Sequence, residues 1–203
     1  MIKTPRGFTL IEMLVSTAIF TVVMVIALGS LLSMSESDRK AQTLKSVINN
    51  LNFSLDSMSR ALRTGTTYGC GAGGDCSSGG TSISFTPANG GSKVVYNFEQ
   101  SNATLCGQPN GTVGCITRSI DGGSTFAPIT SPEVVVTNLK FYAIGTAVGS
   151  ADNMQPKVTI TLSGYVQFKG AGGAAACTAG SSSVGASTCF NLQTSVTERL
   201  YDQ

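Results

Sequence analysis

The sequence contains no histidine and no tryptophan among its 203 residues, and only 12% of its side chains are charged. Histidine is the commonest general base and metal ligand, so its absence argues against triad catalysis and against most zinc sites. The sequence also lacks a Walker loop, a nucleophile elbow and the acidic spacing of a calcium loop. We therefore expect no enzyme activity, no metal site and no cofactor.

An excess of one charge is also missing from most of the chain. The formal net charge is +2, and the two excess positive side chains are Lys3 and Arg6. Beyond them, basic and acidic side chains balance at eleven each. A balanced surface lacks the basic footprint of a nucleic-acid-binding protein, so we expect no strong binding to nucleic acid.

No charged side chain occurs from Met13 to Ser35, where aliphatic residues dominate. A helix over residues 8–32 would be about 37 Å long, enough to cross a hydrocarbon core of about 30 Å. The preceding Lys3 and Arg6 favour a cytoplasmic amino terminus. A cleavable signal peptide has a shorter apolar core without an acid, whereas this segment contains Glu12 near its start.

Glu12 has two interpretations that do not exclude each other. Thr9 and Glu12 match the capping-box pattern at a helix start, where an acid also complements the helix dipole. Alternatively, cleavage after Gly7 would give Phe8 a new ammonium group in apolar surroundings. The Glu12 carboxylate, on the same chain or a neighbour, would then be its natural partner.

The helix is predicted to continue to Thr64, because the segment after Ser35 contains no proline before residue 87. Its apolar residues recur in steps of four and three, which indicates an amphipathic helix. Arg60 and Arg63 suit the last turn, and Gly65 suits a C-terminal cap. The apolar stripe consists of Leu44, Ile48, Leu51, Leu55, Met58 and Leu62, with Val47 beside it.

Beyond Gly65 the composition shifts to glycine, serine, threonine and β-branched residues. Residues 65–81 are predicted to form a loop, and 87–91 a hairpin connection. Alternation of apolar and polar residues predicts antiparallel strands with one buried face. These runs are 82–85, 93–99, 114–120, 133–144, 157–168 and 190–198. The expected fold is α+β, with a long amino-terminal helix packed on an antiparallel β-sheet.

All six cysteines lie beyond residue 69. An even number after a membrane segment indicates disulfides in an oxidising compartment, although buried free thiols remain an alternative. Intervals of 5, 8 and 11 residues do not match CxxC zinc pairs. Nearest neighbours are expected to pair, because each pair flanks a Gly- or Ser-rich stretch such as the tract 170–188. These neighbours are Cys70 and Cys76, Cys106 and Cys115, and Cys177 and Cys189.

The stretch Gly7-Phe8-Thr9-Leu10-Ile11-Glu12, behind a basic leader and ahead of about twenty apolar residues, resembles the prepilin signal of type IV pilins and type II secretion pseudopilins. The resemblance implies that a prepilin peptidase and methyltransferase cuts between Gly7 and Phe8 and methylates the new amine. It also implies that Glu12 pairs with the Phe8 amine of the preceding subunit as helices bundle into a filament.

The same resemblance implies a division of the chain and a location. Residues 1–7 would be the leader, 8–34 the transmembrane or filament-core helix, 35–64 an amphipathic helix, and 65–203 a disulfide-containing β-sheet head. Before assembly the helix would lie in lipid of the cytoplasmic (inner) membrane, with the amino terminus inside and the head outside. Afterwards the subunit would belong to a periplasmic pseudopilus or a cell-surface pilus.

The order and texture of the segments in the head are similar to those of minor subunits, the J kind of type II secretion and the W kind of type IV pili. This likeness implies a tip complex that primes filament growth, with other pilins or pseudopilins and an inner-membrane assembly platform as partners. The paired cysteines and the Gly-rich tract depart from that pattern. A major pilin of the shaft and a tip adhesin or DNA-uptake module remain alternatives.

Overall fold

The computed structural model describes residues 7–71, 74–108, 113–147, 154–167, 183–184 and 187–199. Its contacts separate the chain into two units, Met1–Thr43 and Leu44–Gln203. The first unit holds the amino-terminal part of one long helix. The second unit holds the rest of that helix and all of the strands that the structure describes.

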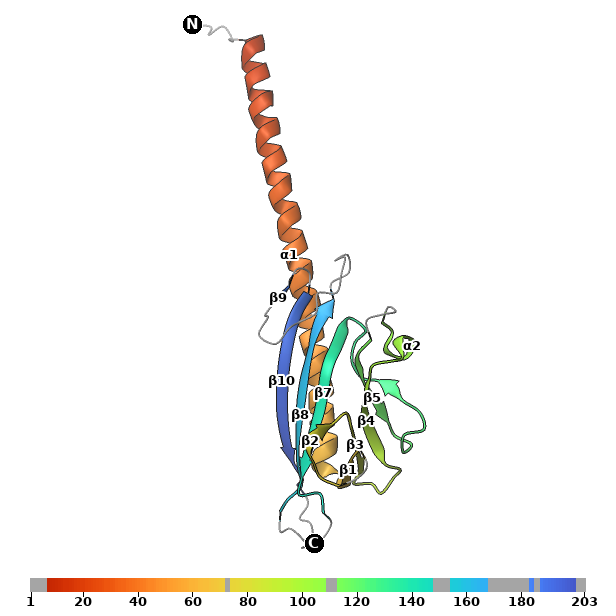
Figure 1. Cartoon of the computed structure of the whole chain (residues 1–203). Coiled ribbons are helices and arrows are strands. Elements are labelled where there is room, and N and C mark those ends of the chain that lie inside the picture. Colours follow the sequence, from red (N-terminus) through yellow and green to blue (C-terminus); the bar gives the residue numbers. More distant parts are fainter. Residues whose placement is uncertain are drawn as a thin grey trace. The chain divides into compact units, whose positions relative to one another are not determined.

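Helix α1 spans Leu10–Thr64, so it begins two residues later than predicted and ends where expected (Figure 1). Glu12 lies in its first turn and Arg63 in its last, where each charge complements the helix dipole. The role predicted for Gly65 needs correction, because this glycine does not have the positive φ of a left-handed cap. A glycine is required there for space, since a Cβ would come within 2.3 Å of the Phe85 ring.

Tyr68 satisfies carbonyl groups at the end of α1. Its hydroxyl donates to the carbonyl oxygens of Leu62 and Gly65, the latter at 2.7 Å. Burial raises the pKa of this phenol well above its usual range, so it remains a protonated donor at physiological pH. The Tyr68 ring also lies 6.3 Å from that of Phe85, centroid to centroid. These contacts hold the turn that leads from α1 into the first strand.

The carboxyl-terminal part of α1 buries one stripe of side chains, as the sequence predicts. The residues of the predicted stripe that are at most 2% exposed are Val47, Leu51, Met58 and Leu62. Leu44 and Leu55 are half-buried against the same core, whereas Ile48 is 46% exposed. Ser54 is also buried, and its hydroxyl donates to the carbonyl oxygen of Ile129 at 2.7 Å. The helix is therefore joined to the strands by both apolar packing and a hydrogen bond.

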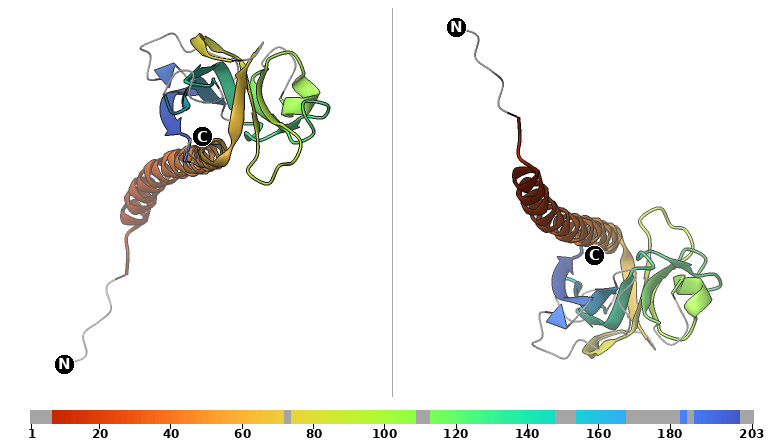
Figure 2. Two further views of the ribbon diagram at one scale, coloured as in Figure 1. Left: turned by 90° about the horizontal axis from the view of Figure 1, so that it is seen from below. Right: turned by 90° about the horizontal axis from the view of Figure 1, so that it is seen from above.

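The described strands form two antiparallel sheets (Figures 1 and 2). The first, in the order β1-β3-β4-β5-β6, contains β1 (Thr66–Cys70), β3 (Ser82–Thr86), β4 (Val94–Glu99), β5 (Cys115–Ser119) and β6 (Ala127–Pro128). The second, in the order β2-β7-β8-β10-β9, contains β2 (Cys76–Gly80), β7 (Val134–Ile144), β8 (Lys157–Gln167), β10 (Ser187–Thr197) and β9 (Ser183–Val184). A short helix, α2 (Ala103–Cys106), connects β4 to β5.

Two features of this arrangement correct the sequence analysis. The strands divide into two sheets rather than one, and residues 65–81 are not simply a loop, because they contain β1 and β2. These strands lack apolar alternation and are held by distant partners, β1 by β3 and β2 by β7. The six predicted strands are present as β3, β4, β5, β7, β8 and β10, and the hairpin at 87–91 is present between β3 and β4.

One hydrophobic cluster joins α1 to strands of both sheets. The alternating residues of two strands show this clearly, because each is at most 8% exposed: Val94, Tyr96 and Phe98 in β4, and Val158, Ile160 and Leu162 in β8. Thr159 and Thr161, between them, are only half-buried. Burial of these apolar residues supplies the main stabilising term of the second unit. The α+β fold with a helix on antiparallel sheets is therefore confirmed.

Two disulfides lie in the described chain, Cys70–Cys76 and Cys106–Cys115. Each joins nearest neighbours in the sequence, as expected. The first closes the connection between β1 and β2, and the second ties α2 to the start of β5. Cys189 is disulfide-bonded, whereas Cys177 and most of the tract 170–188 lie outside the described residues.

Asp75 connects the β1–β2 segment to the end of β7. Its carboxylate accepts hydrogen bonds from the Thr146 N–H at 2.8 Å, the Thr146 hydroxyl at 2.7 Å and the Gly145 N–H at 3.2 Å. The hydrogen bonds from Thr146 lower the pKa of this carboxyl below its ordinary value of 3.8, and the hydrogen bond from Gly145 lowers it further. No local sequence pattern indicates this role of Asp75, because its partners lie 70 and 71 residues farther along the chain.

Asp75→Asn is expected to lower the stability of the second unit in a pH-dependent way. A carboxyl whose pKa is depressed in the folded state stabilises above its unfolded pKa, and this contribution is lost as the pH falls through the folded pKa. The melting-temperature difference between wild type and variant should therefore be largest near pH 6 and shrink below about pH 3.8. Because the carboxylate is exposed, we expect the substitution to lower the free energy of unfolding by less than about 1 kcal/mol. The measurement is thermal unfolding of wild type and variant from pH 2 to 7, which gives the melting-temperature difference at each pH.

The matched control for this prediction is Thr146→Val, which removes the hydroxyl donor and keeps the backbone donor. The two substitutions should be less than additive when combined, because they disrupt the same contact. A pH-independent difference between wild type and Asp75→Asn would show that the carboxylate charge contributes nothing.

Candidate functional site

The apolar segment at the start of α1 is exposed along its whole length in the single chain. All of its large apolar side chains from Phe8 to Met34 are between 46% and 79% exposed. This part of the helix is long and apolar enough to cross a membrane, by length and composition. So large an apolar surface marks contact with lipid or with other protein.

Hydroxyl groups within this segment bond back to the helix itself. Thr17 donates to the carbonyl oxygen of Met13 at 2.9 Å, and Thr21 to that of Thr17 at 3.0 Å. Ser16 does the same toward Met13 at 3.1 Å. These three hydroxyl donors can therefore enter apolar surroundings with a partner already in place. Glu12 is the exception, because it carries the one charged side chain from Phe8 to Ser35.

The surroundings of Glu12 separate its two interpretations. The carbonyl oxygen of Thr9 accepts hydrogen bonds from the backbone N–H groups of Glu12 at 3.1 Å and Met13 at 3.3 Å. The structure shows no side-chain hydrogen bond at either Thr9 or Glu12, although both residues are described, so the reciprocal bonds of a capping box are absent. The Glu12 carboxylate is thus available for a partner outside the described chain.

Gly7 and Phe8 precede the helix in a non-helical segment. A Cβ on Gly7 would meet no atom within 4 Å, and Phe8 is 79% exposed. The peptide bond between them is therefore accessible to a protease in this chain. Residues 1–6 of the predicted leader lie outside the described residues.

Residues 2–28 match the family model of the prokaryotic N-terminal methylation motif. The match covers Gly7, Phe8, Glu12 and most of the exposed apolar segment, and it supports the resemblance to type IV pilins and pseudopilins. It does not reach the second unit of the chain. Comparisons with curated proteins and with solved structures gave no match.

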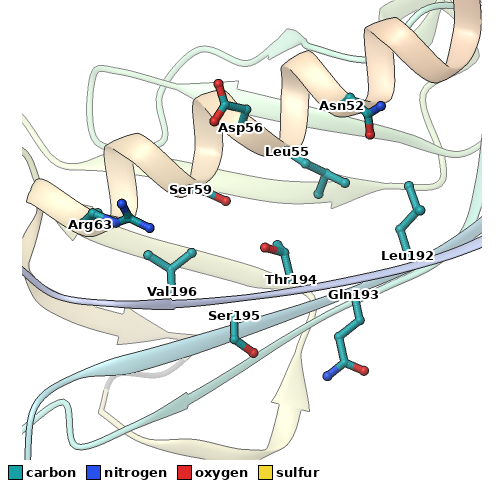
Figure 3. A pocket seen from close by; sticks show the side chains of 10 residues that line it. All are labelled: Asn52, Leu55, Asp56, Ser59, Arg63, Leu192, Gln193, Thr194, Ser195 and Val196. Atoms are coloured by element: carbon teal, nitrogen blue, oxygen red, sulfur yellow. The ribbon is translucent and has the colours of Figure 1, made fainter.

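A second feature, a groove in the second unit, was not predicted from the sequence. It lies between α1 and β10 and has a volume of about 410 Å³ (Figure 3). The stretch 187–197 contains no charged residue and no proline, which favours a regular strand, but nothing in it or in α1 alone indicates a groove between them. The residues that line it are Asn52, Leu55, Asp56, Ser59 and Arg63 of α1, and Leu192, Gln193, Thr194, Ser195 and Val196 of β10.

Proposed function

We propose that the chain is a structural subunit of a type IV pilus or a type II secretion pseudopilus. The observation that carries this proposal is an exposed apolar segment at the start of α1, within a match to the N-terminal methylation motif. The one acid from Phe8 to Ser35, Glu12, has no partner in the described chain. The helix would lie in the cytoplasmic membrane before assembly and in the filament core afterwards. Its function would be assembly rather than catalysis.

Processing would take place at Gly7 and Phe8. A prepilin peptidase would remove residues 1–7 and methylate the amine of Phe8, which leaves a positive charge at the edge of the apolar segment. The remaining chain would consist of a filament-core helix over 8–34, an amphipathic helix over 35–64 and a head over 65–203. The exposed Gly7–Phe8 segment supports this order of events.

Glu12 would then set the position of each helix against its neighbour. A carboxylate and an ammonium that leave water together offset part of the desolvation cost that each would meet alone. Because this charge lies at one fixed point of an otherwise apolar segment, its pairing selects a single register among many similar apolar contacts. The missing capping-box bonds support this assignment, because the carboxylate is not already engaged.

The finer assignment is a minor subunit, of the J or W kind, in a tip complex that primes growth on an inner-membrane assembly platform. It is supported by the order of helix and strands and by the length of the head. A major shaft pilin is the alternative, and the two differ in abundance. A tip adhesin is a second alternative, whereas a DNA-uptake module is less favoured because the charge is balanced.

The test is mass spectrometry of sheared surface filaments from the native host. We expect a peptide that begins at N-methylated Phe8, in trace amount relative to the commonest pilin. The same peptide in dominant amount would make the chain the shaft subunit. Processed protein confined to membranes would indicate a short secretion pseudopilus, and an uncut amino terminus in cells with active peptidase would refute the proposal.

A further inference from the structure

Strand β10 has an open edge over most of its length. It pairs with β8 from Ser187 to Thr197, but on its other side with β9 only at Ser187 and Thr188. Within the described chain, residues 190–197 make no further main-chain hydrogen bond. Backbone donors and acceptors therefore remain unpaired along this edge, which is the feature that allows another strand to add to a sheet.

The other sheet edges carry features that block such pairing. β1 has a register shift and a positive φ of 54° at Thr67, and β2 has a register shift and a positive φ of 82° at Gly79. β6 is two residues long and contains Pro128. In contrast, β10 pairs with β8 without a register shift and contains neither proline nor charge. Long regular edges of this kind are normally protected, so an unprotected one calls for an occupant.

The groove described above runs beside this edge. Leu55 of α1 and Leu192 of β10 face each other across it, whereas Gln193 and Ser195 point to the other side of the sheet (Figure 3). Both leucines are only half-buried, so the helix does not fill the space next to the strand. The backbone N–H of Arg199 donates to the carbonyl oxygen of Arg63 at 2.9 Å and closes the groove at that end.

The closed end of the groove presents the positive side chain of Arg63. Asp56 is 2.7 Å from Arg60, so its charge is already paired. Arg63 forms no ion pair with any described residue, and it lies near Val196 on the opposite wall (Figure 3). An occupant that is apolar near Leu192 and acidic near Arg63 would match the groove. Leu192 and Val196 are about 13 Å apart along a strand, which corresponds to four residues.

We propose that the open edge of β10 receives an extended strand from a neighbouring filament subunit. The strand forms main-chain hydrogen bonds with residues 190–197 and directs alternate side chains into the groove. One apolar side chain packs on Leu55 and Leu192, and a carboxylate four residues away meets Arg63. The identity of the occupant as a filament subunit rests on the proposed function, whereas strand addition rests on the edge and the groove alone.

The test uses the full chain in its native host, with a benzophenone side chain in place of the exposed Gln193. Irradiation should link it to one segment of another subunit, with apolar residues at alternate positions and an Asp or Glu. Two variants test the groove. Thr194→Lys puts a charge on the groove-facing side of β10, and Arg63→Glu reverses the charge at the closed end. Each should lower the yield of the crosslink from position 193 at least tenfold. The control is Thr104→Lys in α2, which lies far from β10 in Figure 1; it should leave the crosslink yield unchanged.

The outcomes separate this inference from the proposed function. N-methylated Phe8 in filaments with no link at position 193 overturns strand addition and leaves the filament role intact. A link to a helical segment, or one that resists both Thr194→Lys and Arg63→Glu, overturns it as well. An uncut amino terminus refutes the filament role, and a strand link that persists in those cells still supports the edge contact. Arg63→Glu changes an exposed side chain, so it decides the result even where Thr194→Lys unfolds the chain.

Discussion

Glu12→Gln is expected to leave the chain inserted in the membrane but to lower its incorporation into filaments by at least about tenfold. Glutamine keeps the size of the side chain and removes its charge. The methylated amine of a neighbouring Phe8 would then enter the filament core without a counter-charge. Loss of one partner of a buried ion pair costs about 3–5 kcal/mol, so a tenfold reduction is a lower bound.

Insertion should not suffer, because removal of an acid makes the apolar segment easier to place in lipid. A charged residue at the bilayer centre costs about 2.5–3.5 kcal/mol, and less near an interface, where Glu12 would lie. The measurement is therefore a ratio, the amount of processed protein in sheared filaments divided by the amount in membranes. The variant should shift that ratio strongly toward the membrane.

Glu36→Gln is the matched control, because Glu36 lies on the same helix and forms an exposed ion pair with Lys40 at 3.0 Å. Exposed pairs of this kind contribute about 0.3–0.5 kcal/mol, so this variant should assemble normally. Normal assembly of Glu12→Gln would mean that the acid serves only the dipole at the start of α1. The absent capping-box bonds already argue against a purely local role.

The elements that sequence analysis located correctly carry a strong local signal. The alternating residues of β4 and β8, and the stripe from Val47 to Leu62, repeat with the period of the structure that they form. Nearest-neighbour disulfides are similarly local, since short intervals separate Cys70 from Cys76 and Cys106 from Cys115. The amino-terminal motif is local as well, and it alone indicated Gly7, Phe8 and Glu12 as candidates.

The features that could not be predicted from the sequence depend on partners that are distant along the chain. β1 and β2 are Gly- and Ser-rich, and they become strands because β3 and β7 lie beside them. Asp75 belongs to no local motif that indicates its role, yet it bonds to Thr146. The groove beside β10 requires α1 and β10 to be placed together, which no periodicity within either segment specifies. Division into two sheets likewise follows from long-range pairing rather than from any strand alone.

Among the substitutions proposed for this protein, Gly114→Ala is expected to destabilise the fold most. It should lower the free energy of unfolding by about 3–5 kcal/mol. Gly114 is buried just before β5, and an added Cβ would lie 1.8 Å from the carbonyl oxygen of Val136 in β7. The obstacle is backbone, so a rotamer change cannot relieve it. Movement of Gly114 would also break the hydrogen bond from the Val136 N–H to its carbonyl oxygen, 2.9 Å long.

The same movement would disturb Gln108, whose buried side chain is satisfied entirely by this region. Its Nε2 donates to the carbonyl oxygens of Gly114 at 3.1 Å and Val134 at 2.6 Å, and its Oε1 accepts from the Gly114 N–H at 2.8 Å. A buried polar group that loses its partner costs about 1–3 kcal/mol, which adds to the steric term. The contacts between the first and second sheets would weaken together.

Thermal unfolding in detergent measures this effect, with an expected decrease in melting temperature on the order of 10 °C. Gly91→Ala is the matched control, because its Cβ would meet nothing closer than the Asn89 side-chain oxygen at 3.4 Å and its φ is not positive. That variant should remain within about 0.5 kcal/mol of wild type. If Gly114→Ala melted within a degree or two of wild type, β5 and β7 would have to separate without cost. The close approach of Gly114 to Val136 would then not hold the two sheets together.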